Sequence, residues 1–377
     1  MRAEIASPNP LRVAIVAPSM GILGGQAVQA SRLIAAWDQD PDVRAWLVPI
    51  DPHPPGLLRH GLRVKYLRTL LTQLTYWPQL VRELRRADVV HVFSASYFSF
   101  LLAPLPAIVV ARLWGKPVVL NYRSGQAPDH LERSSIARAT LRSVDSNAVP
   151  SRFLHDVFAR FGIASQIIPN IVDVERFAFH RRSMLRPRVL STRNFEPLYN
   201  VACTLRAFKH VQNRYPDATL TLVGSGSQDA ALRATVEELA LRNVHFAGRV
   251  PPTDIWRFYA EADIYLQTPD IDNMPSSVLE AFASGCAVVA TRAGGVPAIL
   301  TDDVHGILVP CGDDQAAGAA MLRLLEDPAL ASRLTGAARK SCEQYQWDRV
   351  RRQWLALYRE VSRPGTMATP LPTETQV

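Results

Sequence analysis

The segment 270–285 combines acidic, hydroxyl and small residues in an order that suits phosphate binding. Pro275 favours the first turn of a helix, where its missing N–H is not needed, so we expect a helix to start near it. The backbone N–H groups of Ser276 and Ser277 then point out of the helix start, and together with the helix dipole they form an anion site. The segment therefore predicts a site for a phosphorylated ligand.

Two carboxylates stand eight residues apart in this segment, Asp272 before the expected helix and Glu280 within it. Glu280 shares a helix face with Ser276, four residues earlier. A carboxylate one turn beyond a bound phosphate can accept hydrogen bonds from ribose hydroxyls, while charge repulsion keeps it from the phosphate itself. Two other interpretations of Asp272 stay open: it caps the helix, or it binds a metal ion with Asp270, because paired carboxylates are ligands for hard cations.

The segment 270–285 must be positioned by the strands and helices around it, and the sequence predicts these as short apolar runs that alternate with helical patterns. The first run, 12–18, is followed by glycines and a helical pattern over 27–37, which is the opening of a Rossmann-like unit. Continuous apolar strands separated by helices predict a parallel sheet covered on both faces. The other expected strands cover 43–50, 89–93, 118–122, 147–149, 189–191, 218–223, 244–246, 264–267, 287–290 and 307–310.

The alternation is interrupted by a polar, basic stretch over 179–188 and then starts again. A chain of 377 residues is also too long for one core of ordinary size. We therefore predict an α/β fold with two Rossmann-like domains, 11–180 and 185–344, whose parallel sheets face a central cleft, and a flexible tail over 365–377. Ligands of open parallel sheets bind beyond the carboxyl ends of the strands, so the cleft is the expected site.

The net charge of +8 favours phosphorylated ligands or an anionic lipid surface. No five basic residues are consecutive, and we therefore expect no nucleic-acid partner. The four cysteines are scattered and the first ten residues lack the apolar run of a signal peptide, so we expect a cytoplasmic protein with reduced thiols.

The apolar run 98–114 is interrupted by Pro104, Pro106 and Arg112, which makes it too short and too broken to span a membrane. We expect a buried helix there. Shallow insertion into a bilayer surface is the alternative.

Taken together, these motifs resemble the retaining GT-B glycosyltransferases of the group 1 family (glycosyltransferase family 4-like). Asp272 and Glu280 hold the two places of the family's carboxylate pair. The likeness extends from about residue 12 to 360. Further matching signatures lie at Gly24-Gly25, 88–91, 146–151, 168–170, 224–226, 244–248, 291–297 and 305–310.

The resemblance implies transfer of a sugar, with retention, from a nucleotide-diphosphate sugar to a lipid-linked, polysaccharide or small-molecule acceptor. A UDP-sugar is the family's commonest donor. Front-face attack is implied, with no cofactor and no obligatory metal. The N-terminal domain would bind the acceptor, the C-terminal domain the donor, and the last helix, 347–361, would pack back on the N-terminal domain. The basic surface also fits an anionic membrane, so we expect a protein peripheral at the inner membrane face.

The resemblance also assigns site residues. Arg193 would clamp the diphosphate, Asp272 would hold the donor sugar and Glu280 the ribose. With Arg123, these form the expected catalytic group. The expected donor-binding residues are Gly24, Gly25, Gly224, Gly248, Asn273, Met274, Ser276, Ser277 and Glu280.

Two departures from the family pattern concern charge. Tyr199-Asn200 stands where Lys-Gly is usual, so one cation of the diphosphate clamp is missing. Arg123 stands after the expected strand 118–122, where many members have His, and we hypothesise that it replaces the lost charge. His91, by contrast, is expected to be a buried structural histidine.

Two rival functions stay open. The missing lysine would also fit a non-catalytic nucleotide-sugar binder. Another GT-B enzyme, such as a sugar-nucleotide epimerase or a phosphorylase, is the second rival. A phosphorylase needs a pyridoxal-binding lysine, and the C-terminal domain has only Lys209 and Lys340, both in helical contexts.

Overall fold

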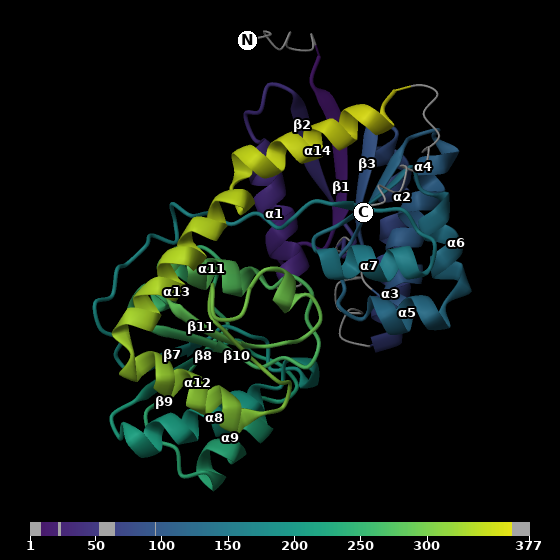
Figure 1. Cartoon of the computed structure of the whole chain (residues 1–377). Helices are drawn as coiled ribbons and strands as arrows, with labels where there is room; N and C mark the ends of the chain where they lie inside the picture. Colours follow the sequence, from purple (N-terminus) through teal and green to yellow (C-terminus); the bar gives the residue numbers. More distant parts are fainter. Residues whose placement is uncertain (1–8, 22–23, 53–64, 95, 364–377) are drawn as a thin grey trace, which may run out of the picture. The chain divides into compact units, whose positions relative to one another are not determined.

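The computed structural model describes residues 9–21, 24–52, 65–94 and 96–363, and it divides into two compact units (Figure 1). Met1–Pro169 and Arg351–Val377 form the first unit, and Asn170–Val350 the second. The first unit thus ends before the boundary at 180 that we expected, and 170–180 belongs with the second unit. The tail expected over 365–377 lies outside the described residues.

The first unit is built on a parallel sheet of six strands in the order β2-β1-β3-β4-β5-β6. β3 and β4 are buried along their whole length, which explains why their sequences are mostly apolar, with His91, Ser94 and Asn121 as buried polar exceptions. The strands are β1 (Leu11–Ala17), β2 (Val43–Pro49), β3 (Val89–Ser94), β4 (Val118–Tyr122), β5 (Ser146–Val149) and β6 (Gln166–Ile167).

The run 98–114 forms two helices rather than the single buried helix that we expected. Pro104 starts the second helix because it cannot continue the first. The middle of the run is buried, but Phe98 and Leu113 are 67% and 77% exposed. The helices of this unit are α1 (Gly25–Trp37), α2 (Lys65–Leu84), α3 (Phe98–Leu102), α4 (Pro104–Leu113), α5 (Ala127–Arg133), α6 (Ser135–Ser143) and α7 (Arg152–Arg160).

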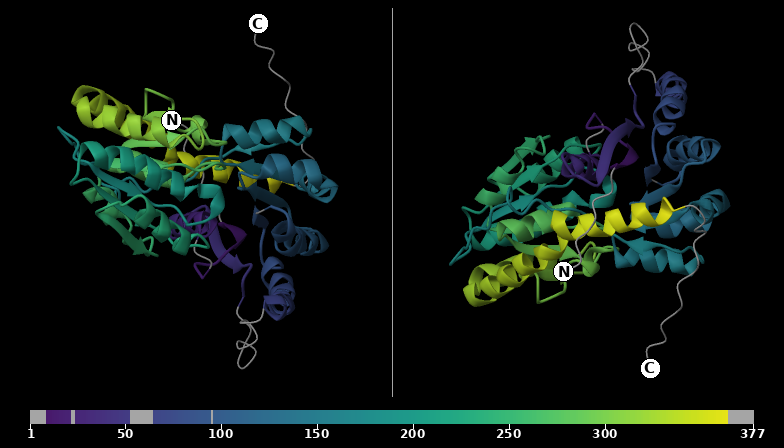
Figure 2. Two further views of the ribbon diagram at one scale, coloured as in Figure 1. Left: turned by 90° about the horizontal axis from the view of Figure 1, so that it is seen from below. Right: turned by 90° about the horizontal axis from the view of Figure 1, so that it is seen from above.

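The last helix, α14 (Trp347–Val361), is the long yellow helix in Figure 2. Its residues from Arg351 onward belong to the first unit. Arg351 forms ion pairs with Asp40 and Asp42, both at 2.6 Å. Tyr358 is fully buried and approaches His91. Among the described residues, no helix combines the length and apolarity that crossing a membrane requires.

The second unit contains another parallel sheet of six strands, in the order β12-β11-β10-β7-β8-β9. Both sheets agree with the predicted α/β fold. The strands are β7 (Arg188–Ser191), β8 (Thr219–Val223), β9 (Val244–Gly248), β10 (Ile264–Gln267), β11 (Ala287–Thr291) and β12 (Ile307–Val309). The helices are α8 (Val201–Arg214), α9 (Asp229–Glu238), α10 (Trp256–Glu261), α11 (Ser276–Ser284), α12 (Asp314–Glu326) and α13 (Pro328–Ser341).

Candidate active site

Helix α11 begins at Ser276, directly after Pro275. Pro275 is the residue before the first turn rather than part of it, a correction of one position. Its φ of −67° and ψ of 113° are those of an extended residue that ends the preceding loop. The first turn carries no acidic side chain, so nothing in the helix sequence itself neutralises the positive end of the dipole. The helix start is therefore electropositive.

Asp272 does not cap this helix, and that interpretation is wrong. One of its carboxylate oxygens accepts a hydrogen bond from the N–H of Asn273 at 2.8 Å. The other lies 2.5 Å from an Nη atom of Arg193. Asp270, two residues earlier, accepts instead from the amide of Asn200 at 3.2 Å. The two carboxylates of the Asp-X-Asp sequence thus have different partners.

Arg193 follows β7 and joins two parts of the candidate site. Besides Asp272, it contacts the hydroxyl of Ser277 at 3.3 Å in the first turn of α11. Its side chain is only 10% exposed. Burial is the largest single influence and lowers the pKa of the guanidinium, but Asp272 and the neighbouring tyrosines together outweigh it, and the pKa is raised overall. Arg193 is therefore a fixed cation at the helix start, and its Nε has no partner among the described residues.

Tyr199 occupies the position of the missing lysine and covers Arg193. The guanidinium carbon lies 4.1 Å from the centre of the phenol ring, a cation–π distance. Asn200 has a φ of 43°, which asparagine tolerates, and its side chain caps α8 through the N–H of Cys203. Tyr199 thus packs against Arg193 and Asn200 caps α8, but neither residue adds a second positive charge.

Glu280 is buried, with 7% of its surface exposed, on the helix that starts at Ser276. Its neighbours along the helix are apolar and buried, so its carboxylate lies in a poorly solvated place. Tyr259 is close to it: burial first, and the charge of Glu280 next, raise the pKa of this phenol. A carboxylate that is kept in such surroundings is a candidate for ligand binding rather than a solvated helix residue.

Glycines bring the loops of the second unit close together. A Cβ on Gly224, whose φ is 153°, would lie 2.2 Å from the carbonyl oxygen of Arg193. A Cβ on Gly295 would lie 2.0 Å from the carbonyl oxygen of Asn273. These positions therefore require glycine for packing around Arg193 and Asn273. Gly248, with φ of 68°, accepts a hydrogen bond from the N–H of Gly224 at 2.9 Å.

Asn170 and Gln267 are site residues that the sequence analysis missed. The buried amide of Asn170 donates to the carbonyl of Met274 at 2.8 Å and so holds the loop before α11. Gln267 is fully buried, and its Oε1 accepts from Ser277 at 3.3 Å. Its Nε2 has no partner among the described residues. A polar residue at the end of the apolar strand β10 was the available signal for Gln267.

The other predicted site residues belong to the first unit. Arg123 follows β4 and donates to the Oδ1 of Asn121 at 3.4 Å. Burial lowers its pKa to about 9, so it is still cationic at neutral pH. Gly24 precedes α1 and Gly25 begins it, and a Cβ on either would meet no described atom within 4 Å. Packing within the described residues therefore does not require these two glycines.

His91 is completely buried, as we expect of a histidine in the core. Both ring nitrogens have partners, the hydroxyl of Tyr358 at 2.7 Å and the amide of Asn121 at 3.1 Å. Burial lowers its pKa to about 3, with a smaller contribution from the charge of Arg123, and the ring is neutral at physiological pH.

Two family models together match most of the chain. The model described as "Glycosyltransferase Family 4" matches residues 23–176, and the model "Glycosyl transferases group 1" matches residues 175–341. The chain belongs to the group 1 glycosyltransferases. It is therefore a glycosyltransferase that takes its sugar from a nucleotide-sugar donor, in a family whose members retain the anomeric configuration.

Curated relatives of this glycosyltransferase act on different substrates. Phosphatidyl-myo-inositol mannosyltransferase of Mycolicibacterium smegmatis is 25% identical over 94% of this chain and 95% of its own length. Glycogen synthase of Mycobacterium tuberculosis is 26% identical over 88% of this chain and 81% of its own length. Sulfoquinovosyl transferase of Arabidopsis thaliana is 26% identical over 75% of this chain, but the match covers only 59% of that protein.

Solved structures show that the fold is GT-B. HepE of Anabaena, solved in complex with UDP-glucose, matches with a TM-score of 0.71 at 18% identity and covers 92% of this chain and 98% of its own. Sucrose-phosphate synthase from Thermosynechococcus elongatus matches with a TM-score of 0.72 at 19% identity, over 93% of this chain and 99% of its own.

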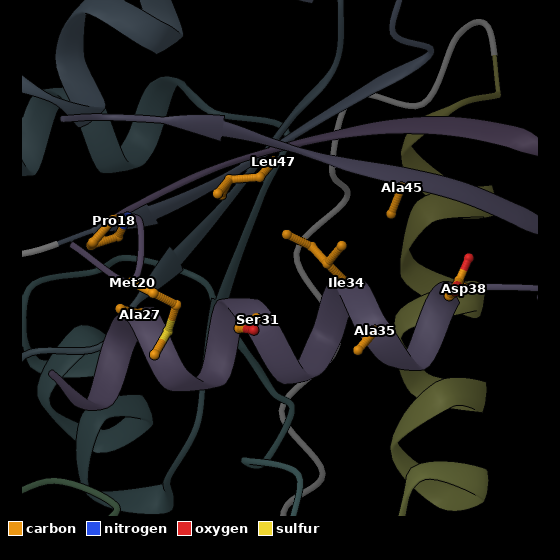
Figure 3. A pocket seen from close by; sticks show the side chains of 9 residues that line it. All are labelled: Pro18, Met20, Ala27, Ser31, Ile34, Ala35, Asp38, Ala45 and Leu47. Carbon is orange, nitrogen blue, oxygen red and sulfur yellow. The ribbon is translucent and has the colours of Figure 1, made fainter. Parts of the chain in front are cut away.

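The glycosyltransferase also has a pocket beside α1 and β2 in its first unit, which none of the predicted site residues lines. Its walls are mostly apolar, and Asp38 is its one ionisable group, so it is unsuited to a diphosphate (Figure 3). The lining residues are Pro18, Met20, Ala27, Ser31, Ile34, Ala35, Asp38, Ala45 and Leu47.

Proposed function

We propose that the start of α11 binds the diphosphate of a UDP-sugar and that Glu280 binds its ribose. The observation that carries this proposal is the cation Arg193, held by Asp272 and Ser277 at a helix start with no acidic residue in its first turn. Asp272 and the backbone of Asn273 and Met274 hold the transferred sugar.

The roles of these residues follow from where charge develops. Cleavage of the sugar–phosphate bond leaves an additional negative charge on the diphosphate, and Arg193 and the helix dipole lower the barrier by stabilising it. Asp272 is engaged by the guanidinium of Arg193 and the N–H of Asn273, which makes it a poor attacking nucleophile. Retention is then achieved by front-face attack, in which the leaving phosphate accepts the proton of the acceptor hydroxyl. Arg123 supplies the charge that Tyr199 lacks.

Thermal shift with nucleotides tests this proposal. UDP and UDP-sugars should raise the unfolding midpoint by about 5 °C or more at one hundred times their dissociation constant. At the same concentration, GDP and ADP should raise the midpoint less, because they bind more weakly. The screen uses UDP, GDP and ADP, each with its sugars. A preference for GDP or ADP would contradict the choice of donor. Donor binding without hydrolysis or transfer across a broad acceptor panel would support the non-catalytic alternative.

We propose a lipid-linked acceptor at an anionic membrane surface, because α2 carries an exposed apolar stripe. Its side chains follow one another at intervals of three or four residues, which places them on one helix face. They are between 40% and 62% exposed. The stripe consists of Leu67, Leu70, Leu74, Trp77 and Val81.

The charges around the stripe favour a bilayer over a second copy of the chain. Arg82 and Arg86, near the end of α2, have side chains that are 70% and 66% exposed. Glu83 is the one acidic residue in 65–86. Two copies that met along this stripe would bring arginines together, whereas anionic headgroups neutralise them while acyl chains accept the apolar side chains.

Vesicle binding checks this surface. A variant with Leu70→Ser and Leu74→Ser should bind vesicles of phosphatidylcholine and phosphatidylserine about ten-fold more weakly than the wild type. The matched control, Ile136→Ser with Met184→Ser, removes exposed apolar side chains elsewhere and should bind normally. Equal binding by both variants, or no preference of the wild type for phosphatidylserine over pure phosphatidylcholine, would contradict the proposal.

A further inference from the structure

A buried chain of hydrogen bonds in the first unit links α14 to Arg123. The hydroxyl of Tyr358 lies 2.7 Å from Nδ1 of His91. Nε2 of His91 lies 3.1 Å from the Nδ2 of Asn121, whose Oδ1 accepts from Arg123 at 3.4 Å. Tyr358, His91 and Asn121 are each no more than 1% exposed. This series of hydrogen bonds therefore connects α14 with the carboxyl end of β4 without contact with bulk water.

The direction of each hydrogen bond is fixed by the chemistry of its members. An amide NH2 group can only donate, so Nε2 of His91 accepts from Asn121. The ring is neutral and carries a single proton, which must then lie on Nδ1 and be donated to Tyr358. Tyr358 thus acts as the acceptor that stabilises this tautomer.

Only one orientation of the Asn121 amide is compatible with both of its neighbours, because Arg123 has only donors and must face the carbonyl oxygen. Because Nδ2 is turned to His91, the carbonyl oxygen is turned to the guanidinium. A flipped amide would oppose NH2 to the N–H groups of Arg123 and leave a buried acceptor unpaired on the histidine, which is costly. Phe93 supports the arginine as well, with its ring centre 5.1 Å from the guanidinium carbon.

We infer that Tyr358, His91 and Asn121 are positioning residues for Arg123, so that the last helix of the chain sets the orientation of an arginine of the donor site. The inference rests on the proposed role of Arg123 in binding the donor diphosphate. It assigns to α14 a function beyond packing.

A double-mutant cycle tests the inference. Tyr358→Phe removes one hydroxyl and keeps the ring, and it should lower kcat/KM for donor turnover about five-fold, the effect of one buried hydrogen bond. In an Arg123→Ala background the same change should have no further effect, because the group that it positions is absent. Turnover of UDP-sugars and the affinity for UDP are measured for all four proteins.

Tyr76→Phe is the matched control. Tyr76 lies in the same unit, is fully buried and donates to the carbonyl of Ala103 at 2.9 Å, away from the chain to Arg123. It should lower the unfolding midpoint about as much as Tyr358→Phe does, but it should leave kcat/KM unchanged. Equal losses of kcat/KM in the two phenylalanine variants would show a merely structural effect and overturn the inference.

The outcomes separate this inference from the proposed function. Two results would refute the positioning role and leave the donor site intact, provided that Arg123→Ala reduces turnover. In the first, Tyr358→Phe has no effect on turnover. In the second, Tyr358→Phe reduces turnover by the same factor in the wild-type and the Arg123→Ala backgrounds. If Arg123→Ala retains wild-type turnover and UDP affinity, Arg123 lies outside the donor site and the inference fails with its proposed role. A wild type that neither binds nor uses a nucleotide sugar refutes the proposed function itself.

Discussion

Replacement of Arg193 by alanine should lower kcat/KM by about two to three orders of magnitude, the usual effect of losing one preorganised group that stabilises developing charge. Tyr199 stands where we expect the second cation of the clamp, and its ring centre lies 4.1 Å from the guanidinium carbon, but it has no charge of its own. Turnover should therefore depend more strongly on Arg193 than it would in a site where a second cation shares the charge of the diphosphate. Because a leaving diphosphate gains charge in the transition state, the loss should fall mainly on kcat.

Two further variants make this measurement specific. Arg193→Lys keeps the positive charge but loses the two guanidinium nitrogens that contact Asp272 and Ser277. Its activity should therefore lie between those of the wild type and Arg193→Ala. Arg233→Ala removes another arginine of the same unit, one whose side chain is 54% exposed and pairs with Asp229, and it should be fully active. Activities are compared below the unfolding midpoint of each variant, since the alanine leaves Asp272 without its ion-pair partner. Arg193→Ala with wild-type kcat would show that the diphosphate leaves elsewhere.

Glu280→Gln should weaken UDP binding about ten- to one-hundred-fold, because hydrogen bonds to a charged, buried acceptor are among the strong ones. The amide has nearly the same shape, but it offers a single acceptor oxygen in place of two, and its NH2 group would oppose a ribose hydroxyl. The change also removes the negative charge that helps to raise the pKa of Tyr259. Isothermal titration with UDP measures the loss.

The deoxynucleotide shows whether Glu280 acts on the ribose. The wild type should prefer UDP to 2′-deoxy-UDP, and the preference should shrink in Glu280→Gln, since the group that recognises the hydroxyl is lost. Glu261→Gln, an exposed carboxylate at the end of α10, is the control and should behave as the wild type. Undiminished discrimination in Glu280→Gln would place the ribose away from this residue.

Much of the fold was predictable from local patterns. Buried parallel strands such as β3 and β10 have mostly apolar sequences, and their boundaries agree with the prediction to within one residue. The segment 98–114 was harder, because periodicity does not show that Pro104 starts a new helix in place of interrupting one. Burial there depends on the neighbouring α2, whose Tyr76 bonds to Ala103 from far along the chain.

The candidate site was predictable where it is local. Pro275, Ser276 and Glu280 lie within one loop and one helix, and their spacing suffices to place the helix start and the buried carboxylate. Contacts between distant segments were not predictable, because no periodic pattern connects them. Asn170 reaches Met274 across 104 positions, and His91 reaches Tyr358 across 267.

A crystal structure with an intact UDP-sugar, or with UDP and a stable analogue, tests the account most directly. We expect electron density for the β-phosphate against the amides of Ser276 and Ser277, with a guanidinium nitrogen of Arg193 at salt-bridge distance and the pentose hydroxyls on Glu280. Density for the nucleotide at any other place, with these groups touching only protein and solvent, would contradict it.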